Sequence, residues 1–145
     1  MNMFRRCFAA VLLALFSCTA ASAAQAEAKA EKVVYHVNDA SNATAALRNI
    51  RNHLDASPQA TIVLVAHGAG IDFLLDGAIA KDGTPYDVAV RELARRGVGF
   101  RVCNNTLEGR KIDRQRVLPE AVIVPSGVAE VTRLQAQEGY VYIKP

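Results

Sequence analysis

The sequence predicts a three-layer α/β/α domain with a mostly parallel sheet of about five strands. Short β-branched or apolar segments alternate along the chain with amphipathic helical segments, and this alternation starts and ends on a strand. Residues 61–66 (Thr-Ile-Val-Leu-Val-Ala) are almost entirely apolar. Such a run is typical of a parallel strand that is covered on both faces.

The first half of the folded region predicts two strand–helix units. Residues 33–38 are β-branched or aromatic and predict a strand. Ser41 is placed to cap a helix that runs to about residue 56. After the strand at 61–66, a second helix is expected because its apolar positions follow the spacing of a helix face; they are Ile71, Leu74, Leu75, Ala78 and Ile79.

The second half predicts three further strands. Thr84 and Pro85 predict the cap and first position of a helix that ends at Gly97, because proline is favoured at the first helical position. Residues 106–118 are polar and basic and predict one or two short helical turns. Ser126 predicts a helix cap, and the apolar positions expected to face inward are Val128, Val131 and Leu134. The strands are expected at residues 98–103, 121–124 and 140–143, the last at an edge.

Residues 1–26 have the layout of a secretory signal peptide. Two arginines are followed by an apolar stretch at residues 7–16 and by small residues at 20–26. Cleavage after Ala23 or Ala26 fits equally well, with a slight preference for Ala26. Residues 27–32 then form a short linker, and residues 33–145 form the domain.

A cleaved signal predicts a periplasmic or secreted protein with no membrane contact after cleavage. A retained membrane anchor and a lipoprotein attached through Cys18 are the alternatives. Loss of the two arginines lowers the formal net charge from +3 to +1, which gives no reason to expect a nucleic-acid partner. Of the three cysteines only Cys103 remains, so an internal disulfide is not available.

Cys103 ends the third predicted strand, and open parallel sheets bind ligands beyond the carboxyl ends of their strands. Backbone N–H groups at the start of the following helical turn favour a thiolate there. Asn104, Asn105 and Thr106 are therefore candidate anion-binding residues, and Arg110 adds positive charge. We expect Cys103 to be partly exposed and reactive; a small, buried and inert cysteine is the alternative.

His67 ends the second strand, where it can act as a base or donate a hydrogen bond to an anion. A histidine that holds a loop is the alternative, and His36 and His53 are expected to be structural. One mature cysteine and three scattered histidines do not predict a metal site. No nucleotide-binding motif is present, so no cofactor is expected.

Several of these segments, taken in order, resemble the DsrE/DsrF-like family, which includes sulfur-relay proteins. The matching segments are residues 63–68 with the apolar residues at 71, 74 and 75, residues 97–106, and residues 122–135 and 139–145. The resemblance covers essentially the whole mature chain. It implies an α/β/α fold, assembly into trimers or hexamers, and a cysteine at the position of Cys103 that carries sulfur as a persulfide.

Two functions follow as hypotheses. In the first, Cys103 takes sulfane sulfur from a donor, holds it as a persulfide and passes it to an acceptor thiol, with His67 and the residues after Cys103 stabilising the anionic sulfur. The chain would then be a sulfurtransferase or sulfur carrier. In the second, it is a non-catalytic oligomeric module that binds a small anion or a protein, and Cys103 is structural. The sequence names neither the donor nor the acceptor.

Overall fold

The computed structural model describes residues 31–145, so the predicted signal peptide lies outside the described residues. Five strands form one sheet in the order β4-β3-β2-β1-β5, and all neighbouring strands are parallel. The strands are β1 (Lys32–Val37), β2 (Thr61–Ala66), β3 (Gly99–Cys103), β4 (Ala121–Val124) and β5 (Val141–Ile143). The predicted fold class is confirmed, and the last strand lies at an edge.

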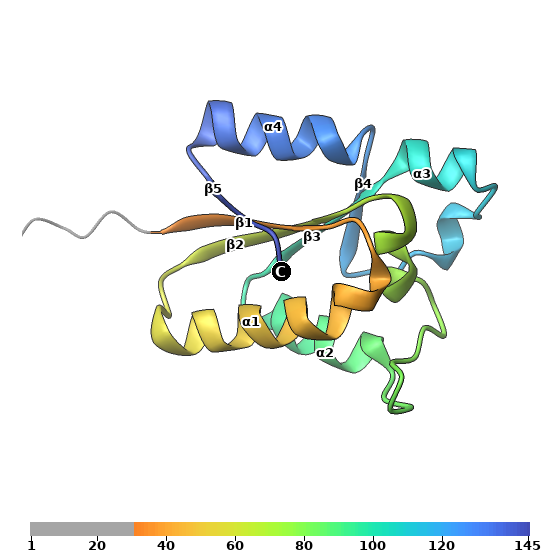
Figure 1. The fold of residues 1–145 in the computed structure, drawn as a ribbon, viewed down its shortest axis with the longest axis horizontal. Helices are drawn as coiled ribbons and strands as arrows, with labels where there is room; N and C mark the ends of the chain where they lie inside the picture. Colours follow the sequence, from red (N-terminus) through yellow and green to blue (C-terminus); the bar gives the residue numbers. More distant parts are fainter. Residues whose placement is uncertain (1–30) are drawn as a thin grey trace, which may run out of the picture.

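Helices cover both faces of the sheet (Figure 1). One face carries α1 (Ala43–Ala56) and α2 (Tyr86–Arg95), the other carries α4 (Gly127–Glu138), and the short α3 (Asn104–Gly109) directly follows β3. Within residues 31–145, no helix is both long enough and apolar enough to cross a membrane.

The core has one apolar layer on each side of the sheet, because successive side chains of a strand point to opposite faces. The larger layer joins the sheet to α1 and α2, with fully buried Leu64, Phe100 and Ile50 among its members. The smaller layer lies beneath α4 and consists of Val34, Val63, Val65, Val131, Leu134 and Tyr140. Residues 62–66 are all buried, as expected for a strand covered on both faces.

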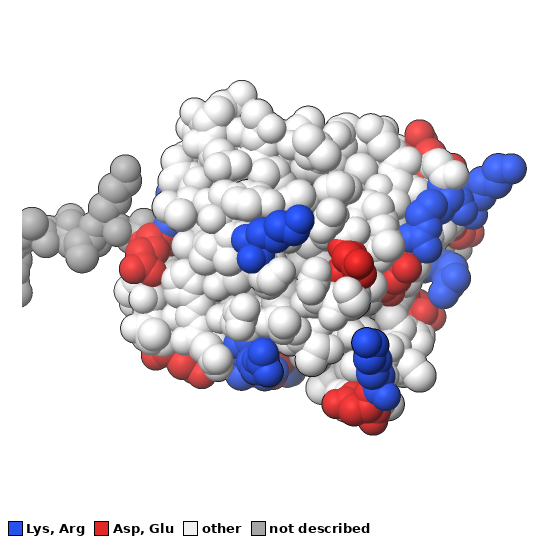
Figure 2. Space-filling model, in the orientation of Figure 1, with Lys and Arg blue, Asp and Glu red and all other residues white. Residues whose placement is uncertain are grey.

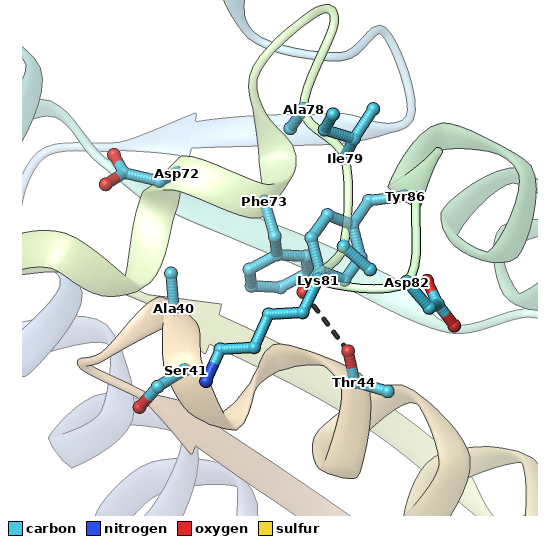
Figure 3. Close-up of a pocket in the computed structure, with 11 residues that line it drawn as sticks. Ala40, Ser41, Thr44, Asp72, Phe73, Ala78, Ile79, Lys81, Asp82 and Tyr86 are labelled. Atoms are coloured by element: carbon cyan, nitrogen blue, oxygen red, sulfur yellow. Dashed lines mark hydrogen bonds between the residues drawn. The ribbon is translucent and has the colours of Figure 1, made fainter. Parts of the chain in front are cut away.

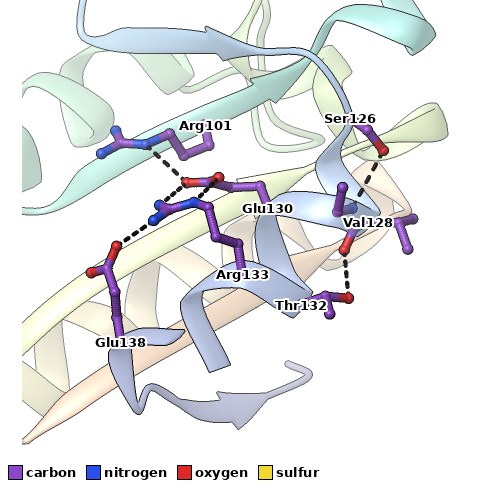
Figure 4. Close-up of polar contacts among 8 residues, drawn as sticks. Arg101, Ser126, Val128, Glu130, Thr132, Arg133 and Glu138 are labelled. Carbon is purple, nitrogen blue, oxygen red and sulfur yellow. Dashed lines mark hydrogen bonds and ion pairs between the residues drawn. The ribbon is translucent and has the colours of Figure 1, made fainter. Parts of the chain in front are cut away.

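Charged side chains also hold α4 against β3 (Figure 4). Glu130 of α4 lies between two arginines, with Arg101 of β3 at 3.8 Å and Arg133 of α4 at 2.8 Å. Glu138 pairs with the same Arg133. The hydrogen bond from Arg133 lowers the pKa of the largely buried Glu130 carboxyl. Glu130 therefore stays ionised and fixes the helix above the strand that ends at Cys103.

The helix expected at residues 71–79 is wrong. The chain forms a 3₁₀ helix at Gly68–Leu74 and then an ordered loop at residues 75–85. Ile71, Leu74 and Leu75 are buried as the pattern indicated, but Gly77 has a φ of 74°, which is incompatible with a continuing helix. Antiparallel bridges at Leu75 and Ile79 hold the loop instead.

Two of the three predicted helix starts differ from the structure. Asp39, not Ser41, accepts the capping hydrogen bond, because a 3₁₀ turn at Ala40–Asn42 precedes α1. Pro85 occupies the cap position of α2 in an extended conformation, and the helix begins one residue later. Ser126 caps α4 as predicted, by accepting from the N–H of Ala129. However, Val128 points outward and is 59% exposed.

Candidate functional site

His67 and Cys103 lie side by side at the carboxyl ends of the neighbouring strands β2 and β3. Ala66 of β2 pairs with Val102 of β3, so the next residue of each strand lies at the same edge and faces α4. Gly127, the first residue of α4, fits between them. A Cβ atom at Gly127 would lie 3.0 Å from Cβ of His67 and 3.2 Å from Cβ of Cys103. Only glycine lets the start of α4 come this close without displacing a neighbour.

Four donors lower the pKa of the Cys103 thiol. They are the Thr106 hydroxyl and the backbone N–H groups of Gly127, Thr106 and Asn105. Burial raises the pKa of Cys103, but these hydrogen bonds outweigh burial, and the pKa lies below its ordinary value. The arrangement stabilises a thiolate, which is the nucleophilic form of cysteine.

Thr106 is oriented by the loop after β2. Its Oγ1 accepts a hydrogen bond of 2.9 Å from the N–H of Gly68. A hydroxyl has a single hydrogen, so once the oxygen is used as an acceptor its hydrogen remains free to point at a second group. The Thr106 hydroxyl lowers the pKa of Cys103, so this hydrogen is available to stabilise the thiolate. The hydroxyl thus connects the strand end of β2 to the thiol on β3.

The thiol is less accessible than the sequence indicated. Cys103 is 5% exposed, so the expectation of a partly exposed residue is wrong. The cause is the close approach of Gly127, which places the first turn of α4 beside the strand end. Polar donors, rather than apolar groups alone, line the side of the residue that faces α3 and α4.

The His67 ring packs against a second histidine. The rings of His67 and His36 are stacked, with centroids 4.8 Å apart and planes at 27°. His36 in turn shares a 2.7 Å hydrogen bond between its Nδ1 and the hydroxyl of Tyr142 on β5. Burial, with smaller effects of His67 and Lys144, lowers the pKa of His36. Among the described residues, His67 makes no side-chain hydrogen bond to Cys103; the two are neighbours through Gly127.

The other predicted anion-binding residues are only partly brought together. Asn105 and Thr106 direct their N–H groups at the thiol, and that of Asn105 also reaches the carbonyl of Pro125 at 3.3 Å. The Asn104 side chain instead bonds Glu108 and Arg114. Arg110 turns away to Asp72, at 2.6 Å, and to the carbonyl of Gly68, at 3.2 Å. In this structure Arg110 therefore braces the loop after β2 and does not face the thiol.

Three groups at the site were not predicted from the sequence. The N–H of Gly127 had a signal, because a Ser-Gly pair after the fourth strand predicts a helix start at the same edge of the sheet. The Thr106 hydroxyl and the packing of His36 on His67 had none, since both depend on side-chain orientation. Among residues 31–145, no group of three potential metal ligands comes together. The donors that lower the pKa of Cys103 support the chemistry of a stabilised thiolate nucleophile.

Two solved structures share this fold. A protein of unknown function from Methanobacterium thermoautotrophicum, MTH1491, is 31% identical with a TM-score of 0.71 over 79% of this chain and 99% of that chain. The YchN protein of E. coli is 14% identical with a TM-score of 0.67 over the same shares. A search of curated proteins gives no match. A model of the DsrE/DsrF-like family matches residues 17–145, and the chain belongs to that family.

Proposed function

We propose that this chain handles sulfane sulfur by carrying it as a persulfide on Cys103. The observation that carries the proposal is the set of four donors around the thiol, which lowers the pKa of Cys103 although the residue is buried. An inert core cysteine needs no such donors. Membership of a family that includes sulfur-relay proteins supports the same conclusion.

The reaction needs no external oxidant. The Cys103 thiolate attacks a sulfane sulfur atom of a polysulfide or thiosulfate-type donor, a new S–S bond forms, and the old bond breaks. Its electron pair leaves with the departing sulfide or sulfite. The product is a Cys103 persulfide anion, which the Thr106 hydroxyl and the neighbouring N–H groups stabilise. An acceptor thiolate then attacks the outer sulfur and returns Cys103 as a thiolate.

The direct test is intact-mass measurement after incubation of the mature chain with polysulfide. The protein should gain about 32 Da, the mass of one sulfur atom, and a reductant should remove it. Cys103→Ser should gain nothing. The serine hydroxyl lies among existing donors, so we expect a stability loss of only about 1 kcal/mol. A wild-type protein that stays unmodified while a cysteine peptide in the same tube is loaded would refute the proposal.

The second candidate, a non-catalytic module with a structural cysteine, is favoured by one observation, the 5% exposure of Cys103. Alkylation distinguishes the two. The proposed thiolate should react with a small reagent such as iodoacetamide in the native protein at neutral pH. A thiol that reacts only after denaturation would establish the structural role.

We also propose that the protein is exported, from the signal-peptide layout of residues 1–26. Intact mass of the chain recovered from the periplasm should give a start at Ala24 or Glu27. A periplasmic chain that begins at Met1 would contradict cleavage, and a lipid-modified Cys18 would establish the lipoprotein alternative.

Finally, we propose that the chain assembles with copies of itself. Large apolar side chains are exposed on the edge strands and on α4; they are Val122, Val128, Val141 and Tyr142. Figure 2 shows a surface over α4 without charged side chains, whereas basic and acidic groups are interspersed lower down. Such a surface favours association, and the family resemblance indicates a trimer or hexamer.

A further inference from the structure

A cavity lies beyond the carboxyl ends of β1 and β2, beside the starts of α1 and α2. Its volume is about 680 Å³, within the range of small-molecule sites. The 3₁₀ turns after β1 and β2, the first turn of α1 and the loop at residues 75–85 form its walls. Figure 3 shows the rings of Phe73 and Tyr86 side by side in its interior. Their centroids are 5.7 Å apart in an edge-to-face arrangement.

The loop at residues 75–85 lines the cavity and is held in place by backbone hydrogen bonds of its own. The N–H of Ala80 donates to the carbonyl of Thr84 at 2.8 Å, and that of Tyr86 to Ala78 at 3.0 Å. Ile79 bridges to Pro85 and is nonetheless 65% exposed. Ile79 therefore presents apolar surface at the lining of the cavity, where a ligand can cover it.

Most of the polar side chains at the cavity already have a hydrogen-bond or ion-pair partner within the protein. Asp72 is paired with Arg110 at 2.6 Å, and Asp82 accepts from the N–H of Thr84 at 3.0 Å. The Tyr86 and Thr44 hydroxyls share a 3.1 Å hydrogen bond. Lys81, by contrast, extends across the cavity in Figure 3 and makes no hydrogen bond within residues 31–145. It lies close enough to Asp39 to add to the Ser41 hydrogen bonds that lower the pKa of that carboxyl.

A second cavity of about 290 Å³ continues from the first along α1. The two share the lining residues Thr44, Ala80, Asp82 and Tyr86. The second adds Arg48, which is also without an ion pair in the described part of the chain, and Arg51, which is held by Glu92 at 2.9 Å. Lys81 and Arg48 thus flank the two cavities without a hydrogen-bonded partner in the described residues, with Asp82 as the acidic side chain that the two cavities share.

We propose that this cavity binds a small amphipathic anion, with a flat apolar body against Tyr86 and Ile79 above the buried Phe73 and an acidic group near Lys81. Apolar contact supplies most of the binding free energy, and the ammonium group orients the ligand. The cavity does not include Cys103, although Asp72 at its lining pairs with Arg110, which also donates to the carbonyl of Gly68 beside the thiol site.

Titration with naphthalene-2-sulfonate, followed by amide chemical shifts in NMR, tests the proposal. Saturable shifts should concentrate on residues 72–86 and the start of α1. Lys81→Met should weaken binding by about two- to fivefold, the range of an exposed ion pair. Ile79→Ser should weaken it by about tenfold or more, because covered apolar surface is lost.

Two controls make the result decisive. Arg95→Met removes a cation on α2 that lines neither cavity, and it should leave binding unchanged. Naphthalene-2-methanol is a neutral probe of similar shape, and Lys81→Met should leave its affinity unchanged. The proposal would be overturned if a naphthylmethylammonium cation bound with equal affinity, or if Lys81→Met left the affinity for the sulfonate unchanged. Chemical-shift changes centred on Val122 and Val128 would also overturn it.

Discussion

Thr106 determines how strongly the site holds a charged sulfur. It contributes a hydroxyl and a backbone N–H to the thiol, and its oxygen is fixed by the N–H of Gly68. A hydrogen bond to a charged group stabilises it more than one between neutral groups does. The hydroxyl therefore favours the thiolate of Cys103 over the thiol.

Replacement of this hydroxyl should make Cys103 less reactive near neutral pH. In Thr106→Val the thiolate loses a donor, so the pKa of Cys103 rises from its lowered value. The thiolate fraction at a given pH then falls, and the curve of iodoacetamide reaction rate against pH moves to higher pH. Stopped-flow or timed mass spectrometry measures this curve.

Two variants serve as controls for this prediction. Thr106→Ser keeps the hydroxyl and should retain the wild-type curve. Thr132→Val removes a hydroxyl on α4 that bonds only the carbonyl of Val128, and it should also leave the curve in place. A curve that does not move in Thr106→Val would show that the hydroxyl does not act on the sulfur.

Sequence reasoning located this site by topology but did not resolve its side chains. His67 and Cys103 were found because the carboxyl ends of parallel strands meet at one edge. The direction of the Arg110 side chain was not predictable, since it depends on Asp72 of a distant segment. The same holds for the His67 ring, which stacks on His36 from a neighbouring strand.

At the scale of elements, the start of α4 is the feature that completes the site. Gly127 directs its N–H at the Cys103 sulfur and leaves room for His67 and Cys103 on either side. The close approach depends on the missing side chain, because the nearest neighbours of an added Cβ are the Cβ atoms of two strand-end residues.

Gly127→Ala should therefore damage both stability and thiol chemistry. Overpacking of this kind costs about 1–3 kcal/mol, which urea unfolding measures as a lower midpoint. The displaced N–H should also raise the pKa of Cys103, so alkylation slows at neutral pH. Gly109→Ala is the matched control, because a Cβ there meets nothing within 4 Å. A Gly127→Ala variant as stable as wild type would show that the helix start can shift freely.

The strands were more predictable than the connections between them. β2 and β4 have the predicted bounds because a short apolar segment between turn residues fits few alternatives. The segment at residues 71–79 has helical spacing but forms a 3₁₀ helix and a loop, because packing buries Ile71 and Leu74 while Gly77 turns the chain. The apolar spacing correctly predicted that Ile71 and Leu74 are buried, but it did not predict the backbone conformation of the segment.

The exposed apolar side chains indicate how the chain assembles. Val128 lies on the first turn of α4 and is 59% exposed. Val122 and Val141 extend apolar surface to the two edge strands, β4 and β5. A closed, symmetric assembly buries such side chains away from water. It also stops growing, because every copy of the interface is already occupied.

Light scattering of the mature chain at micromolar concentration should therefore give the mass of a trimer or hexamer. Val128→Asp should shift the protein towards monomer, because a carboxylate would be buried unpaired in the interface. The variant should still fold, since an acidic residue in the first turn of a helix is favourable. Val88→Asp, at a site 57% exposed on α2, is the control on the opposite face and should leave the assembly intact. A monomeric wild type would contradict the assembly, and a Val128→Asp protein that keeps its full mass would place the interface elsewhere.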